Sequence, residues 1–120
     1  MAYLAMIYDR PTDQQQLAEY LNQVQGWIGR IIKMPGAVSF VAYRSPDGTS
    51  PSIWTMAEFR SLAEARNAAN SPEMRAVLEE LRRFGVSPTQ VVLERSEFTP
   101  EPVRADPARQ HAAPPELAVD

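Results

Sequence analysis

Cysteine is absent from this 120-residue chain, and histidine occurs once, as His111. Without cysteine there is no disulfide framework, no thiol nucleophile and no thiolate metal site. His111 lies in a proline-rich stretch near the C-terminus, where we expect a solvated side chain and not a ligand. The sequence therefore offers no metal site.

An excess of positive charge and long apolar runs are also missing. Twelve Lys and Arg residues against fifteen Asp and Glu residues give a net charge of −3, which does not favour nucleic acid or an acidic membrane surface as a partner. No apolar run reaches the roughly 18 residues that a membrane span needs, and the N-terminus lacks the layout of an export signal. We expect a cytoplasmic protein with no nucleic-acid and no membrane partner.

The composition changes near residue 99. Residues 1–98 have the length and apolar content of one domain, whereas residues 99–120 hold five of the eleven prolines and no aromatic residue. Such a segment cannot bury enough apolar surface to offset the entropy lost on ordering. We therefore expect one domain, residues 1–98, followed by a Pro-rich flexible C-terminal tail, residues 99–120.

Hydrophobic periodicity predicts four strands, at residues 2–8, 37–44, 52–59 and 89–97. Between the first two strands, an apolar face with helical spacing predicts a helix from a cap at residue 12 or 13 to about Lys33, ended by Met34-Pro35-Gly36. After the third strand, Ser61 and Glu64 form a capping-box pattern in which each side chain satisfies the other residue's backbone donor. That helix is expected to break near residue 70 and to resume over residues 72–84.

This order of elements is two β-α-β units in tandem. It predicts an α+β, ferredoxin-like βαββαβ fold, with a four-stranded antiparallel sheet and the helices on one face. The strands do not alternate apolar with polar: in the first, Tyr3 and Ile7 lie opposite Leu4 and Met6. Because burial of the second apolar face stabilises by about 25 cal/mol per Å², we expect a homodimer in which another copy covers it.

Several short motifs resemble the antibiotic-biosynthesis monooxygenase family of the dimeric α/β-barrel superfamily. They are Gln25-Gly26-Trp27-Ile28 with Met34-Pro35-Gly36, the hairpin Ser45-Pro46-Asp47-Gly48-Thr49, and Ser71-Pro72-Glu73-Met74-Arg75-Ala76. The resemblance covers about residues 1–98. It implies a dimeric α/β barrel and, in the best-known members, a monooxygenase that acts on polyketide phenols and quinols without any cofactor.

The resemblance also implies an asparagine on the third strand, a tryptophan at its end and a tyrosine in the next helix. The corresponding positions here hold Thr55, Phe59 and Ala65, so the family's catalytic set is replaced and no catalytic residue is assigned. Thr55 can still donate a hydrogen bond to a substrate oxygen.

Aromatic side chains are the remaining candidates for a binding site. We expect a pocket for a hydrophobic aromatic small molecule, with these substrate-binding residues: Trp54, Tyr43, Thr55, Phe59, Trp27 and Phe40. The alternative for each aromatic residue is a place in the core or the dimer interface. Three functions stay open: a cofactor-independent monooxygenase, a non-catalytic ligand-binding or assembly protein, and an isomerase or cyclase of the same fold.

Overall fold

The computed structural model describes residues 1–107, so His111 and the rest of the predicted tail, residues 108–120, lie outside the described residues. The elements follow in the order β1 (Ala2–Tyr8), α1 (Gln14–Ile32), β2 (Ala37–Arg44), β3 (Ile53–Phe59), α2 (Leu62–Ala69), α3 (Pro72–Arg83) and β4 (Thr89–Glu94). No helix in this part of the chain is long and apolar enough to cross a membrane.

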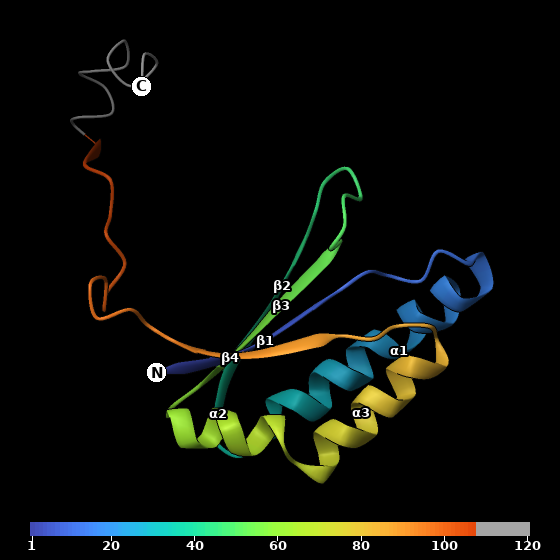
Figure 1. Ribbon diagram of the computed structural model, residues 1–120, viewed down its shortest axis with the longest axis horizontal. Coiled ribbons are helices and arrows are strands. Elements are labelled where there is room, and N and C mark those ends of the chain that lie inside the picture. Colours follow the sequence, from blue (N-terminus) through green and yellow to red (C-terminus); the bar gives the residue numbers. More distant parts are fainter. Residues whose placement is uncertain (108–120) are drawn as a thin grey trace.

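The four strands form one antiparallel sheet in the order β2-β3-β1-β4. Figure 1 shows all three helices on one side of this sheet, with the other side left open. The structure confirms the predicted ferredoxin-like α+β fold with a four-stranded antiparallel sheet, while the dimer stays a prediction.

Side-chain caps start the helices where the sequence predicts them. The Asp13 carboxylate accepts a hydrogen bond from the Gln16 backbone N–H at 2.9 Å, and the Ser71 hydroxyl accepts one from Met74 N–H at 3.0 Å. At α2 only half of the capping box forms. The Ser61 hydroxyl accepts from Glu64 N–H, but the Glu64 carboxylate accepts from the Ser61 hydroxyl, not from the Ser61 backbone. Each cap satisfies a helix N–H that would otherwise lack a partner.

Three predicted boundaries are wrong by one to three residues. The last strand ends at Glu94 and not at residue 97, because Glu94 pairs with Ala2, the first residue of β1, and no strand continues beyond it. The third strand begins at Ile53 and not at the predicted residue 52. The last helix ends at Arg83, one residue early, and Gly85 follows with φ +78°.

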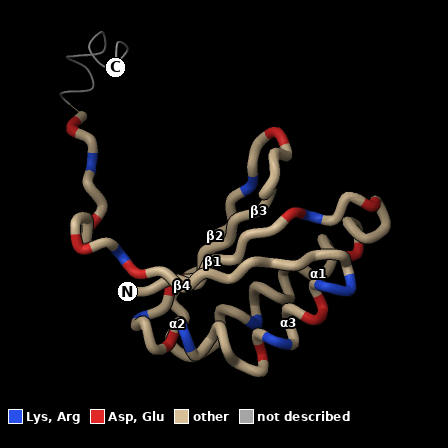
Figure 2. Tube along the Cα trace, viewed as in Figure 1, with Lys and Arg blue, Asp and Glu red and all other residues tan. Residues whose placement is uncertain are grey.

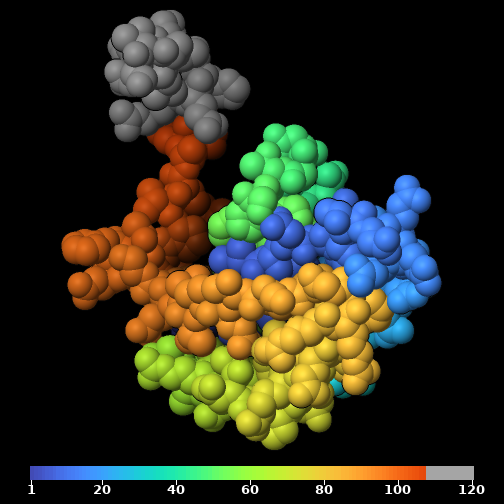
Figure 3. Space-filling model, turned by 45° about the vertical axis from the view of Figure 1, so that its right-hand side comes forward, coloured from blue at the N-terminus to red at the C-terminus, as the bar shows by residue number. Residues whose placement is uncertain are grey.

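The hydrophobic core fills the space between the sheet and the helices. Its largest fully buried side chains are Leu4 from β1, Phe59 from β3, Met74 and Val77 from α3, and Val86. After β4, Arg95 donates hydrogen bonds to the Tyr3 hydroxyl and to the Pro100 carbonyl, which fixes the start of the following segment. From there to residue 107, the chain leads away from the helices (Figure 3).

The side of the sheet away from the helices, here called the open face, is largely apolar, with Glu58 hydrogen-bonded to Ser39 at one end. Figure 2 shows the strands almost free of charged residues. Direct cross-strand pairs place Tyr43 beside Trp54, and Val41 beside Met56, on this face. Tyr43 is 60% exposed, Trp54 45% and Val41 42%, and Leu93 of β4 adds to the same face at 40%. Exposed apolar patches of this kind mark interaction surfaces.

Gly36 provides the first prediction. Its φ is +84°, and a Cβ at this position would collide with the Glu64 carboxylate. Gly36→Ala should therefore lower the free energy of unfolding by about 1–3 kcal/mol, measured by urea denaturation. Gly48→Ala is the matched control and should lose less stability, because Gly48 has a similar φ of +76° but no neighbouring atom near the added Cβ. If both variants lose the same stability, the collision with Glu64 contributes nothing.

Candidate functional site

A cavity of about 320 Å³ lies between the helix side of the sheet and helices α1 and α3. The strand register arranges its floor in rows across β2, β3 and β1. Arg44, Ile53 and Tyr8 share the row at one end, and Ala42, Thr55 and Met6 form the next. Further in, Phe40 continues the floor. The row that carries charge is therefore at one end of an otherwise apolar floor.

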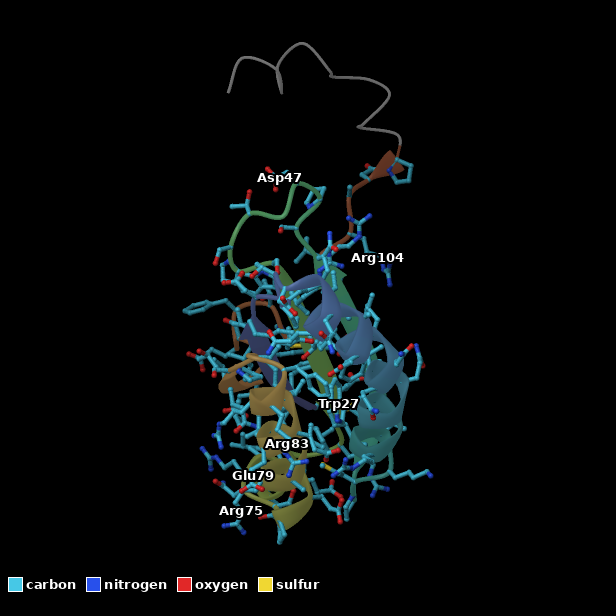
Figure 4. All side chains as sticks on the ribbon, turned by 90° about the vertical axis from the view of Figure 1, so that its right-hand side faces the viewer. Trp27, Asp47, Arg75, Glu79, Arg83 and Arg104 are labelled. Carbon is cyan, nitrogen blue, oxygen red and sulfur yellow. The ribbon has the colours of Figure 1, made fainter. Side chains whose placement is uncertain are left out.

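Helix α1 provides the facing wall. Tyr20, Val24, Trp27 and Ile31 recur every three or four residues, which places them on one side of the helix, and all four line the cavity. Val77 and Leu81 of α3 complete the apolar part of the lining. Figure 4 shows Trp27 between α1 and α3. The rings of Tyr8, Tyr20, Trp27 and Phe84 follow one another, with centroids 5.7–6.2 Å apart.

Two buried tyrosine hydroxyls form the main polar feature of the cavity. The hydroxyls of Tyr8 and Tyr20 are 2.5 Å apart and hydrogen-bonded. Burial raises the pKa of the Tyr8 phenol well above its ordinary value, and the hydrogen bond and charge interaction with Tyr20 raise it further. Burial also raises the pKa of Tyr20, while the Tyr8 hydrogen bond and the positive charge of Arg10 lower it in part. At neutral pH both side chains are hydrogen-bond donors and not bases.

Two further polar atoms belong to lining residues. The Thr55 hydroxyl donates to the Met6 carbonyl of the neighbouring strand at 3.3 Å. The indole N–H of Trp27 is buried and finds no acceptor among residues 1–107. A buried donor without a partner costs about 1–3 kcal/mol, and the described chain does not offset this cost at Trp27.

Charge in the lining is only positive. Arg10 and Arg44 contribute to the cavity, and no Asp, Glu, His or Lys does so among the described residues. Within residues 1–107, no group of three or more His, Cys, Asp or Glu side chains is placed to hold a metal ion. The described lining thus consists of an apolar body, neutral donors and two arginine residues.

Four of the six expected binding residues meet at this cavity. Trp27, Phe40 and Thr55 line it, and Tyr43 contributes at the β2 edge although most of its side chain is exposed. Trp54 lies on the open face, where its indole donates to the Pro51 carbonyl at 3.0 Å. Phe59 is fully buried in the core. The binding role of all six stays a prediction.

The positions that correspond to the family's catalytic set are also separated. Thr55 lines the cavity, whereas Phe59 and Ala65 are core residues with 0% exposure. Sequence reasoning missed Tyr8, Arg10 and Arg44. Tyr8 had a usable signal, because it has the same strand parity as Leu4 and Met6. The two arginines had none, since they are far apart in the sequence and only the folded chain brings both to one cavity.

Comparison with solved structures shows the same fold in several proteins. A proposed antibiotic biosynthesis monooxygenase from Deinococcus radiodurans superposes with a TM-score of 0.68 at 8% identity, covering 88% of this chain and 99% of the other. SnoaB, a cofactor-independent oxygenase from Streptomyces nogalater, gives 0.62 at 15% identity over 83% of this chain and 98% of the other. An ethyl tert-butyl ether D family protein from Bacillus halodurans gives 0.59 at 23% identity over 80% and 99%.

No protein-family model and no curated protein matches the sequence. The chain has the fold of the antibiotic biosynthesis monooxygenases, a fold shared here at 8–23% sequence identity with the three proteins above. At that distance the likeness establishes the architecture and not the reaction.

The buried tyrosine pair predicts a loss of stability in alkali. An unfolded chain releases each phenolic proton near pH 10, but the folded protein holds the protons of Tyr8 and Tyr20 to higher pH. The contribution is fully present below about pH 10. Above it the free energy of unfolding should fall by up to about 1.4 kcal/mol per pH unit for each of the two.

Urea denaturation between about pH 8 and pH 11 measures this slope. Tyr8→Phe should make the slope shallower, whereas Tyr43→Phe, which removes a largely exposed hydroxyl, should not change it. Equal slopes in the wild-type protein and in Tyr8→Phe would contradict the prediction.

Proposed function

We propose that this protein is a small enzyme that oxidises a flat aromatic, quinol-like or polyketide-like molecule with O₂, without a bound cofactor. The observation that supports it is the cavity, whose volume of about 320 Å³ lies within the range of small-molecule sites. Its apolar lining with few polar groups suits a planar ring system. The shared fold with SnoaB, described as a cofactor-independent oxygenase, agrees with this proposal.

The proposed oxidation requires few functional groups from the protein. For an anthrone, O₂ converts the ring CH₂ into a carbonyl, and the second oxygen atom leaves as water with the two hydrogens of the CH₂. The electron-rich substrate reduces O₂ itself. The protein contributes orientation and removal of water, and the Tyr8–Tyr20 hydroxyl pair has one proton outside its mutual hydrogen bond that it could donate to a substrate oxygen.

A second candidate is a protein that binds an aromatic molecule without converting it. It is favoured by one observation: no carboxylate or imidazole lines the cavity in the described part of the chain, and the raised pKa values of Tyr8 and Tyr20 make them poor bases. An isomerase or a cyclase that moves a proton needs a group of this kind, so the geometry favours it least.

Oxygen uptake with hydroquinones and anthrones separates these candidates. The enzyme should consume O₂ faster than the uncatalysed background, and Ala42→Trp should reduce the rate at least about tenfold, because the indole fills the cavity floor next to Thr55. Ala63→Trp is the control, since Ala63 is an exposed residue of α2 outside the cavity. Uptake at the background rate, with ligand binding retained in the wild-type protein, would exclude the oxygenase and support the second candidate.

We further propose a homodimer in which two open faces cover one another. The proposal rests on the apolar side chains of Val41, Tyr43, Trp54 and Leu93, which are 40–60% exposed on one side of the sheet. The described chain has no element on that side (Figure 1). Two-fold pairing of identical faces is the commonest way to bury such a surface.

Sedimentation equilibrium should therefore give about twice the mass of one 13.4 kDa chain. Val41→Glu should shift the equilibrium towards the monomer, because an unpaired carboxylate would be buried in the interface. Ile32→Glu is the control, since Ile32 is a 37% exposed residue at the end of α1, on the helix side. A wild-type protein that remains monomeric at micromolar concentration would contradict the dimer.

A further inference from the structure

One end of the cavity gathers all of its charge and its hydroxyl pair. We call this end the polar mouth, formed by Tyr8, Arg10, Tyr20 and Arg44. Arg44 and Tyr8 flank Ile53 in one row across β2, β3 and β1, so their Cα atoms are about 10 Å apart, two strand spacings. The Arg10 backbone N–H donates to the Ser52 hydroxyl at 3.1 Å, which holds Arg10 against the start of β3.

The two arginines of the polar mouth form no ion pair with a carboxylate of the described chain. Neither Arg10 nor Arg44 takes part in any of the ion pairs formed within residues 1–107. The nearest acidic residues in sequence accept hydrogen bonds from neutral groups instead, so they keep their charges without pairing with either arginine. Asp9 accepts hydrogen bonds from the Ser50 hydroxyl and the Ser52 backbone, and Asp13 caps α1. Across the hairpin, Asp47 accepts from Thr49.

The lining also carries more hydrogen-bond donors than it uses. The Tyr8 and Tyr20 hydroxyls have two protons between them, and their mutual hydrogen bond uses one. The other proton is free to be donated. Further in, the buried Trp27 N–H has no acceptor among the described residues. An acceptor oxygen of a ligand at the polar mouth would take the free hydroxyl proton of the tyrosine pair, and the two arginines there favour an oxygen that carries negative charge.

We propose that the cavity selects planar aromatic ligands in their ionised form, as enolates, phenolates or carboxylates, with the charged oxygen at the polar mouth and the rings on the apolar floor. This inference rests on the proposed function and narrows its substrate class. It also accounts for the lack of a base in the described lining. A ligand that is captured after losing its proton in water needs no protein group to remove that proton.

Tryptophan fluorescence can test the selection, because one of the two tryptophans lies in the cavity and the other outside it. Trp54→Phe leaves Trp27 as the only reporter. The probes are 2-hydroxy-1,4-naphthoquinone, an acidic enol that is ionised at neutral pH, and its neutral methyl ether, 2-methoxy-1,4-naphthoquinone. The enolate should bind at least about tenfold more tightly than the ether. The carboxylate 2-naphthoate and its methyl ester provide a second pair, which distinguishes the two kinds of anion.

Arginine-to-glutamine variants then show which charges cause the preference for the anionic probe. Arg10→Gln and Arg44→Gln should each weaken binding of the enolate about three- to tenfold and leave binding of the ether unchanged, with a smaller difference at high salt. Arg83→Gln is the matched control, because it makes the same change of net charge at an exposed α3 residue outside the cavity. Both mouth arginines are exposed, so these variants should fold. Tyr8→Phe, which removes one hydroxyl of the pair, should also reduce the preference for the enolate.

Each outcome has one meaning. Equal affinity for anion and neutral ether, or arginine variants that behave like Arg83→Gln, would overturn the selection for anions and leave the proposed aromatic site intact. No quenching of Trp27 by any of the four probes would overturn both this inference and the proposed function.

Discussion

The structure depends on the central strand β1, which pairs with β3 on one side and β4 on the other. Its alternating side chains divide the molecule into two parts. Leu4, Met6 and Tyr8 face the helices, whereas Tyr3, Ala5 and Ile7 face away from them. Because a shift by one residue would exchange these two sets, the register of β1 determines both the core and the site. The same strand thus supplies a fully buried core residue, Leu4, and a polar cavity residue, Tyr8.

The cavity exists because the helices cover the sheet unevenly. At the end of the sheet where β1 begins, α2 packs against β1, β3 and β4, and side chains such as Phe59 fill the interior. At the other end, the cavity lies between α1 and strands β2 and β3, where the side chains of Ala42 and Thr55 are small and leave space unfilled. A cavity of this kind loses packing energy, which suits a site that a planar apolar ligand would fill.

Charged groups enter this site only at or just beyond the ends of strands. Arg10 lies just beyond the end of β1 and Arg44 at the end of β2, and both residues are exposed while they line the cavity. The floor behind them is apolar. The cavity thus has a polar mouth that can bind a charged group and an apolar body that can bind aromatic rings. These residues are not the catalytic set that the family resemblance implies. In the proposed function, the substrate supplies the reactivity, and the protein supplies an environment that orients the substrate and removes water.

The sequence alone determined the order of elements, the approximate starts of the helices and the ferredoxin-like architecture. These follow from local periodicity and from short-range hydrogen bonds such as the one from Gln16 N–H to Asp13, which a linear pattern contains. It also identified Trp27, Phe40, Tyr43 and Thr55 as residues that now line one cavity. It could not show that Trp54 and Phe59 lie outside this cavity, because aromatic residues are common in cores, interfaces and pockets alike.

Tertiary structure alone decided the end of β4, the Tyr8–Tyr20 hydrogen bond and the proximity of Arg10 to Tyr20. The strand ends where its partner β1 has no further residue, and the tyrosines meet across twelve residues of chain because α1 folds back over β1. Each of these depends on which residues of distant segments become neighbours. That information lies in the register between strands and in the path of the helix, and neither is a property of any single stretch of sequence.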